Sequence, residues 1–512
     1  MKKFSLILLA FILSVTSCKQ NENKSKTSQQ DVAQTDIVTS IIEEENSFYY
    51  IDFNNYPNQN KNLSIGVFDS GTGGLTVLKA IVNYDENNNQ TYAKGRDGKK
   101  DFKEESFIYF ADQANMPYGN YSKENKLNLL NEHIIKDVQF LMSDQYYLNA
   151  SSQTVNTDKE PVKVLVIACN TATAYGKENI ENFLKKANSN IKVIGVIDAG
   201  VRGTLSNLEK DEDAIIGVMA TVGTVSSKGY KNTLLKLKDQ LGYTGHIEVF
   251  SQGGLGIAEA VDEDPNYYDK NLKKPRVDYK GPSLIGGVKI DKTLFDIYNF
   301  DFDNSKMLCD SEKSDDCSIL QINDAENYVR YHLVTLLEKI RQSMTNNKLK
   351  SIILGCTHYP YLTKEIDSVL KELYNYKNKE GQYLYRDFMV NDIKLIDPAV
   401  GTAKELYDYL EKEKLFNPEG HVRNSEFYIS VPNKDNPNNV IDEQGRFPYD
   451  YKYGRNANEI QEYVKVVPFS RTNISTDILK RLEEKTPYTY QLIENFSQNN
   501  NKSNKLSNDT KI

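Results

Sequence analysis

Short apolar runs alternate with amphipathic segments through the central part of the chain. The first run ends at a glycine-rich turn, which is followed by the amphipathic segment Leu75 to Val82. This order predicts strand, loop and helix, and its recurrence predicts an α/β protein with parallel sheets covered by helices on both faces. The runs lie at Leu63 to Phe68, Phe107 to Phe110, Val162 to Ile167, Val193 to Ile197, Ile215 to Met219, Ile352 to Leu354 and Lys394 to Ile396.

Two polar stretches break this alternation, at Asn87 to Glu105 and at about 264–324, and we interpret both as insertions. Residues 497–512 are rich in asparagine, serine and lysine, a composition typical of a disordered tail. A chain of 512 residues with 39% hydrophobic positions is long for one core, so we expect two domains.

The N-terminus follows the order of a secretory signal. Lys2 and Lys3 precede the apolar run Phe4 to Leu13, which is too short to remain as a membrane-spanning helix, and Val15-Thr16-Ser17-Cys18 resembles a lipobox. We therefore expect residues 1–18 to be a lipoprotein signal with lipid on Cys18, and residues 19–62 to be a disordered polar tether. The protein would then lie in the cell envelope, on the periplasmic side, with the lipid as its only membrane contact. If the signal is not used, it would be cytoplasmic.

The net charge of -8, from 63 basic and 71 acidic residues that are well interleaved, offers no basic face for a polyanion. This argues against nucleic acid as a partner. Among the five cysteines, Cys309 and Cys317 lie in the acidic segment CDSEKSDDC. A local disulfide is one interpretation for an exported protein, and a metal site is less favoured because no histidine lies nearby.

Ligands of open parallel sheets bind at the carboxyl ends of the strands, so the loops there are the places to seek chemistry. Asp69 to Gly74 forms a glycine-rich loop between a strand and a helix, which could hold an anion or could be only a tight turn. Asp112 follows the second strand and precedes Met116-Pro117-Tyr118-Gly119. An aspartate in such a place is more often a turn former than a catalyst.

Two further loops each place a cysteine at the end of a strand. They are Ala168-Cys169-Asn170-Thr171 and Gly355-Cys356-Thr357-His358. A cysteine there is usually a small core residue. Two cysteines in equivalent positions, each beside polar groups that could hold a carboxylate, raise the hypothesis of a paired function.

Six stretches carry a resemblance to the glutamate racemase family. In chain order they are IGVFDSGTGGLTVLKAI, FADQANMPYG, VIACNTATAYG, ATVGTVSSKGY, LGCTHYPYL and LIDPAVGTA. Each is modest alone, but the ordered set is specific and spans about Leu63 to Leu410. The resemblance implies two flavodoxin-like domains with pseudo-two-fold symmetry and an active site between them. One would comprise 63–207 and 391–470, and the other 209–390, so that each supplies one cysteine.

The resemblance also implies a cofactor-independent amino-acid racemase that interconverts L-glutamate and D-glutamate without pyridoxal phosphate or a metal. Cys169 would act on the D-enantiomer and Cys356 on the L-enantiomer, one as thiolate base and the other as thiol acid. Asp69 and His358 would poise the thiols, with secondary help from Asp112. The best match to the family's assisting glutamate is Glu259, although Ser251-Gln252 stands where the family has Cys-Pro.

Hydroxyls and backbone amides suit the binding of a charged substrate. The positions that match the family's substrate-binding residues are Asp69, Ser70, Pro117, Tyr118, Gly119, Asn170, Thr171, Thr221, Thr224, Thr357 and His358. Two alternatives stay open, a binding lipoprotein for an acidic amino acid without turnover and an aspartate racemase. The family supplies D-glutamate for peptidoglycan in the cytoplasm, so an exported member would have another role. Whether the protein forms a homodimer is also open.

Overall fold

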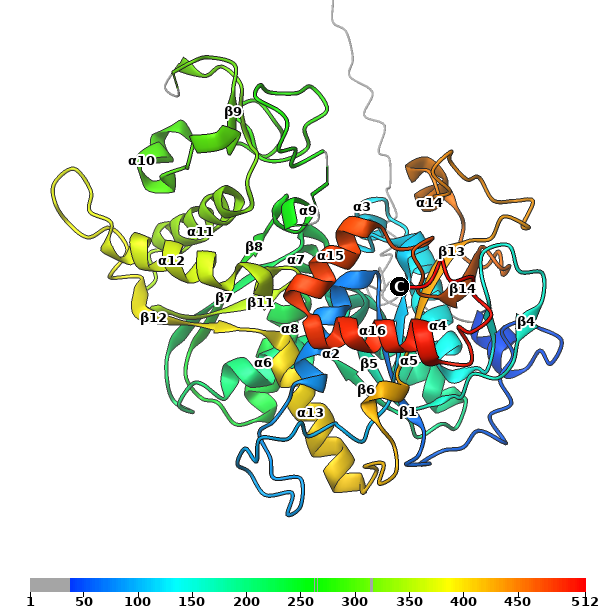
Figure 1. Ribbon diagram of the computed structural model, residues 1–512. Coiled ribbons are helices and arrows are strands. Elements are labelled where there is room, and N and C mark those ends of the chain that lie inside the picture. Colours follow the sequence, from blue (N-terminus) through cyan, green and yellow to red (C-terminus); the bar gives the residue numbers. More distant parts are fainter. Residues whose placement is uncertain (1–36, 262, 265, 314–315) are drawn as a thin grey trace, which may run out of the picture.

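A computed structural model describes residues 37–512, apart from 262, 265, 314 and 315. It is an α/β structure with two main sheets (Figure 1). The first sheet has six strands in the order β14-β13-β2-β1-β5-β6. Its strands are β1 (Ser64–Asp69), β2 (Phe107–Ala111), β5 (Val162–Ile167), β6 (Lys192–Gly195), β13 (Glu426–Pro432) and β14 (Val464–Pro468). All neighbours are parallel except β13 and β14, which are antiparallel.

The second sheet has four parallel strands in the order β12-β11-β7-β8. They are β7 (Ala214–Ala220), β8 (Ile247–Gly253), β11 (Leu349–Gly355) and β12 (Met389–Ile396). The predicted fold class, with parallel sheets and helices between the strands, is confirmed. Two short hairpins complete the strands, β3 (Tyr146–Tyr147) with β4 (Val155–Asn156), and β9 (Met307–Cys309) with β10 (Leu320–Ile322).

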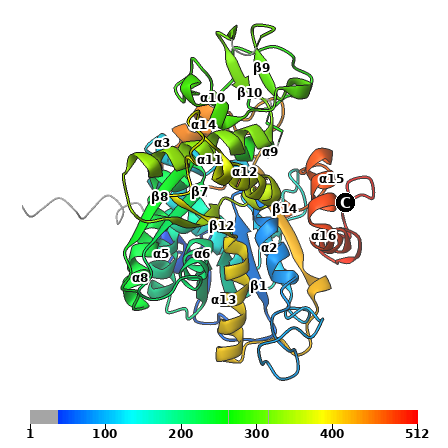
Figure 2. The same ribbon diagram turned by 90° about the vertical axis from the view of Figure 1, so that its left-hand side faces the viewer.

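Helices cover both faces of the first sheet, as Figure 2 shows from the side. α4 packs against α5, whereas α2 packs against α13 and α16. The helices are α2 (Leu75–Val82), α3 (Gly119–Lys123), α4 (Leu127–Met142), α5 (Asn170–Lys186), α6 (Val196–Leu205), α7 (Val222–Ser226), α8 (Gly229–Gln240), α9 (Ile257–Val261), α10 (Phe295–Tyr298), α11 (Ala325–Gln342), α12 (Thr363–Asn375), α13 (Pro398–Glu413), α14 (Tyr449–Gly454), α15 (Thr476–Lys485) and α16 (Pro487–Asn499). Across the described residues, no helix is long and apolar enough to cross a membrane.

The boundary between the two sheets differs from the prediction. Residue 391 was expected to begin the return to the first domain, but β12 pairs with β11 in the second sheet, with Ile352 opposite Leu395. The chain returns only at α13, which packs against α6 and α2. The pairing partner of a short strand depends on tertiary contacts, so its own residues could not reveal this boundary.

The predicted tether is wrong for residues 37–62. Ile37, Val38 and Ile41 lie on one side of a helical turn and, together with Tyr49 and Ile51, are buried in the same apolar cluster as β1 and β5. The polar composition of the preceding stretch hid this short apolar face. Cys18, the signal and residues 19–36 lie outside the described residues.

The predicted disorder of residues 497–512 is also wrong. Ser497, Ser503 and Ile512 are buried, and the Ser497 hydroxyl accepts a hydrogen bond from the Ile512 amide at 2.8 Å. The tail therefore packs through hydrogen bonds made by its polar side chains, which composition alone does not predict.

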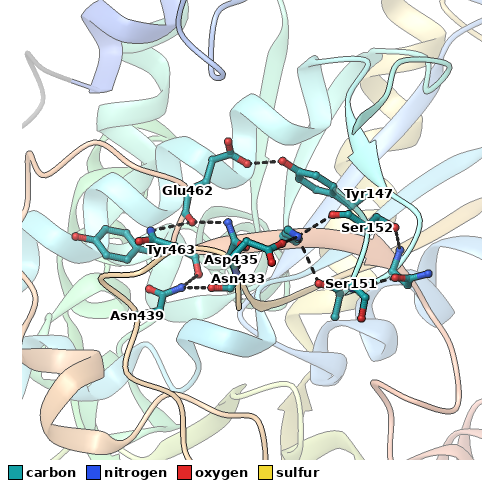
Figure 3. A network of polar contacts seen from close by, with 12 residues as sticks. Tyr147, Ser151, Ser152, Asn433, Asp435, Asn439, Glu462 and Tyr463 are labelled. Atoms are coloured by element: carbon teal, nitrogen blue, oxygen red, sulfur yellow. Dashed lines mark hydrogen bonds and ion pairs between the residues drawn. The ribbon is translucent and has the colours of Figure 1, made fainter. Parts of the chain in front are cut away.

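The edge strand β14 is held by the polar network in Figure 3. Lys465 is buried, and its ammonium donates to the Ser152 carbonyl at 2.7 Å and forms an ion pair with Asp435. Nearby, the Tyr147 hydroxyl donates to the Glu462 carboxylate at 2.6 Å. The network joins the strand to the loop around the β3-β4 hairpin, so the region after α13 packs with the first sheet.

The second insertion, with α10, β9 and β10, lies at the top of Figure 1 and packs its apolar side chains into the core of the second domain. Cys309 and Cys317 are joined by a disulfide within it. This decides between the two interpretations of the pair in favour of the local disulfide.

Candidate active site

Both cysteine loops lie at the carboxyl ends of parallel strands, one on each sheet. Cys169 follows β5 and Asp69 ends β1, its neighbour in the first sheet, while Cys356 follows β11 in the second sheet. Both cysteines are buried, each with 5% of its surface exposed. The predicted placement of one cysteine on each domain is therefore what the structure shows.

The glycine-rich loop Asp69 to Gly74 of the first domain touches the loop of the second domain that carries Cys356. A Cβ added at Gly73 would lie 2.7 Å from the Thr357 hydroxyl and 2.9 Å from Cε1 of His358. The Thr76 hydroxyl lies 3.2 Å from the Thr357 carbonyl oxygen, to which it can donate. The loop that follows Asp69 and the loop that carries Cys356 and His358 thus meet at the domain boundary, where a glycine allows their close approach.

A second close approach between the domains lies where helices α3 and α7 begin. A Cβ added at Gly223, in α7, would lie 2.6 Å from Cα of Gly119, at the start of α3. Both Gly119 and the nearby Thr224 were predicted substrate-binding positions. The site therefore lies between two glycine contacts that hold the two domains together.

Cys169 caps the first turn of α5. Its sulfur accepts a hydrogen bond from the Ala172 amide at 3.4 Å and donates to the Ser70 hydroxyl at 3.7 Å. Burial first and the nearby charge of Asp69 second raise the pKa of the Cys169 thiol to about 12, against the lowering effect of its hydrogen bonds to Ala172 and Ser70. The resting site consequently holds Cys169 as a neutral thiol.

The Asp69 carboxylate accepts a hydrogen bond from the Gly74 amide at 2.7 Å. Burial raises the pKa of Asp69, against the lowering effect of the Gly74 amide, the His358 charge, the Ser70 amide and the Cys169 thiol. A carboxylate whose pKa is raised is a better proton acceptor, and this one interacts with the Cys169 thiol.

Cys356 has an imidazole as its neighbour. Its sulfur lies 3.7 Å from Nδ1 of His358, and the Thr357 hydroxyl lies 3.5 Å from the same nitrogen. Each cysteine therefore has a titratable side chain beside it, Asp69 on the first domain and His358 on the second.

Hydroxyls predicted to bind substrate gather where α5 and α7 begin. The Thr224 hydroxyl lies 3.3 Å from the Thr171 hydroxyl and 3.0 Å from the Thr221 hydroxyl. The Asn170 side-chain oxygen accepts a hydrogen bond from Tyr230 at 2.6 Å. Sequence reasoning missed Tyr230, although it closes the stretch ATVGTVSSKGY.

Asp112 is bound within its own loop region. Its carboxylate accepts hydrogen bonds from Tyr118 at 2.6 Å, Ser430 at 2.7 Å and the Asn115 amide. The Tyr118 hydroxyl also lies 2.7 Å from Asp137, whose pKa is raised well above its usual range by burial and by the charge of Asp112. One hydroxyl proton cannot serve two carboxylates at once, and burial together with the charge of Asp112 favours the protonated form of Asp137. These contacts make Asp112 an anchor of the predicted Pro117 to Gly119 loop, and its catalytic help stays a prediction.

Glu259 lies in the first turn of α9 and accepts a hydrogen bond from the Gly256 amide at 3.0 Å. Burial raises the pKa of Glu259, and the charge of His358 lowers it, so the Glu259 carboxylate interacts electrostatically with His358. Tyr359, which sequence reasoning missed, is fully buried, and its hydroxyl donates to the Gly254 carbonyl at 3.3 Å. Burial raises the pKa of Tyr359, and the charges of Cys356 and Glu259 raise it further. Its place in the stretch LGCTHYPYL, directly after His358, was the sequence signal.

Metal-ligating side chains converge at one place among the described residues, where Cys309, Asp310 and Cys317 meet. The disulfide occupies both sulfurs, so this group offers no thiolate pair to an ion.

Comparison with known proteins finds glutamate racemases. The glutamate racemase of Oceanobacillus iheyensis is 31% identical over 367 residues, which cover 72% of this chain and 86% of the relative. That of Lactobacillus johnsonii is 26% identical over 355 residues, covering 69% and 84%. No family model matches the chain. Among solved structures, a glutamate racemase isoform of Bacillus anthracis is 22% identical with a TM-score of 0.41, over 72% of this chain and 88% of that one. The Francisella tularensis glutamate racemase in complex with D-glutamate is 22% identical with a TM-score of 0.39, over the same shares.

Proposed function

The chain belongs to the glutamate racemase family, and from this premise we propose that it interconverts L-glutamate and D-glutamate by proton transfer between two cysteines. The observation that carries the proposal is the pair of buried thiols at the ends of β5 and β11, one on each side of the interdomain contact. Such a pair can face the two sides of one α-carbon.

The chemistry follows from the weak acidity of an amino acid's α-proton. A racemase needs a base on one face of the carbon, an acid on the other, and charge stabilisation for the planar carbanion-like transition state. In the direction from D to L, the Cys169 thiolate takes the α-proton and the Cys356 thiol delivers one to the opposite face. In the reverse direction the roles exchange. Solvent protons then restore the starting state.

Asp69 and His358 would prepare the two thiols for this exchange. Since burial and Asp69 hold the Cys169 thiol neutral in the resting site, substrate must change the balance. The α-ammonium of glutamate brings a positive charge to the site, which lowers the pKa of the Cys169 thiol, and Asp69 can accept the released proton. The hydroxyls of Thr171, Thr221 and Thr224 would bind the carboxylates.

The test is proton exchange at the α-carbon in the full chain. With L-glutamate in deuterated water under reducing conditions, NMR should show the α-proton replaced by deuterium while D-glutamate accumulates. Cys169→Ala and Cys356→Ala should each slow both processes at least 100-fold, since general acid–base groups contribute about 10²- to 10⁴-fold.

A Cys309→Ser, Cys317→Ser double variant, which removes cysteines away from the site, is the matched control and should keep the activity. Exchange with aspartate in place of glutamate would assign the other substrate. Tight binding of either amino acid with no exchange would replace the racemase by a binding protein.

The cellular place is part of the proposal. The lipoprotein-type signal that ends at Cys18 supports a lipid-anchored protein on the periplasmic side of the envelope, acting on amino acids there. A racemase outside the cytoplasm would act on free or released amino acids rather than supply cell-wall precursors.

A further inference from the structure

The C-terminal extension, residues 471–512, is built onto the first domain. Leu479 and Leu482 of α15 are buried in the same apolar cluster as β1 and β5. The Lys79 ammonium on α2 donates to the Lys485 carbonyl, the last residue of α15, at 2.9 Å. This extension lies beyond the stretches that carry the family resemblance, which end near Leu410.

One side chain of the extension reaches the second domain. The Arg481 guanidinium donates to the Val261 carbonyl at 3.3 Å, and Figure 1 shows α15 beside α9. Val261 is the last residue of α9, whose Ile257 and Ala260 are buried in the core of the second domain. Carbonyls in the last turn of a helix lack partners within the helix and favour a cation.

α9 is also the helix that carries Glu259. It has five residues, and Glu259 lies two positions before Val261. A helix this short has little stability of its own, so its position depends on what it contacts at each end. At its start, the Glu259 carboxylate is bound to the Gly256 amide, and at its end Val261 is bound to Arg481.

We propose that Arg481 is a positioning residue for the racemase reaction, which holds α9 across the domain contact and so keeps Glu259 in place near His358. The proposal rests on the proposed function and adds a role for the C-terminal extension. Arg481 touches neither thiol, so it acts through the helix. Because it joins the two domains, it also fixes the position of α9 relative to the first domain.

The test compares Arg481→Ala, Arg481→Lys and Lys480→Ala in the full chain. Lys480 is exposed on the same helix, so its replacement removes an equal charge without the contact to α9. Two measurements are made on each protein, amide hydrogen exchange of residues 257–261 by mass spectrometry and the kinetics of glutamate racemisation.

Arg481→Ala should speed amide exchange in α9 and lower kcat, each by about tenfold, with KM changed less than twofold, because a charged hydrogen bond is lost away from the substrate. Arg481→Lys should recover most of both, and Lys480→Ala should match the unaltered protein. Faster exchange with unchanged kcat would make the contact merely structural and overturn the proposal, as would no change in either measurement. If the unaltered protein does not racemise glutamate, the proposed function fails, and unchanged exchange in Arg481→Ala would then also overturn the contact's role in holding α9.

Discussion

The Thr76 hydroxyl lies 3.2 Å from the main-chain oxygen of Thr357, although the two residues belong to different domains. Thr76 is in the first turn of α2, directly after the Asp69 loop, and Thr357 directly follows Cys356. This contact joins the two halves of the site directly, without a bound substrate. Opening of the domains must break it.

The first prediction concerns the glycine beside this contact. Gly73→Ala puts a methyl group 2.7 Å from the Thr357 hydroxyl, so the two loops must separate. We expect kcat/KM for glutamate to fall at least tenfold, because small misalignments at a reacting centre cost about this much or more. Gly203→Ala is the control, since its nearest neighbouring atom, on Ile396, would be 3.8 Å away. Equal activity of the two variants would contradict the close approach.

The second prediction concerns the ionisation of Cys169. With a pKa of about 12, roughly one molecule in 10⁴ carries the Cys169 thiolate at pH 8 in the substrate-free protein. Alkylation of Cys169 by iodoacetamide, followed by mass spectrometry, should therefore rise about tenfold per pH unit from pH 7 to pH 10. A plateau near pH 8.5, the value of an ordinary thiol, would refute this.

The third prediction separates the two effects of Asp69. Asp69→Asn removes a negative charge that raises the pKa of Cys169, so at pH 8 the thiol should be alkylated faster than in the unaltered protein. Racemisation should nevertheless fall, because the amide cannot accept the thiol proton. If both rates fell, the charge of Asp69 would not be acting on Cys169 as the geometry indicates.

The fourth prediction concerns His358. His358→Asn removes the imidazole that lies 3.7 Å from the Cys356 sulfur, and kcat/KM should fall about 100-fold. His421→Asn is the matched control, because His421 is exposed and caps a short helix outside the site. Initial rates with each enantiomer check the result. A His358 variant with more than a tenth of the normal activity would remove the imidazole from the mechanism.

The fifth prediction distinguishes anchoring from catalysis at Asp112. Its buried carboxylate accepts hydrogen bonds from Tyr118 and Ser430, so Asp112→Asn should lower the free energy of unfolding by about 1–3 kcal/mol. Ser430→Ala should cost about 1 kcal/mol, and urea denaturation measures both. As an anchor, Asp112 should affect kcat by less than tenfold in protein that remains folded. A larger loss would support the catalytic help that the family resemblance implies.

Local patterns predicted those parts of the fold that depend on local residues. The segment Leu75 to Val82 was predicted as a helix and forms α2, because its apolar positions match the helical period and the preceding glycines end the strand. The two thiols were placed at strand ends for the same reason. Contacts between distant segments could not be predicted from the sequence. The pairing of β12 with β11 and the bond from Arg481 to Val261 depend on the tertiary fold.

Sequence reasoning was weakest where polar residues are buried. Ser497 and Ser503 looked like parts of a disordered tail, yet their hydroxyls are bonded inside the structure. Tyr230 and Tyr359 were passed over because tyrosine is frequent along the chain, with 34 copies, so no single one stood out. Their importance comes from position beside Asn170 and Cys356, which only the assembled site shows.

The burial of Ile37 limits how far the folded body can lie from a lipid anchor at Cys18. If Cys18 carries the lipid as proposed, only residues 19–36 can separate the anchor from the folded body, because Ile37 already packs against the first domain. Eighteen residues cannot extend beyond roughly 60 Å, even as a straight chain. The enzyme would then work within a shallow layer above one membrane leaflet, and it would meet only those amino acids that diffuse through that layer.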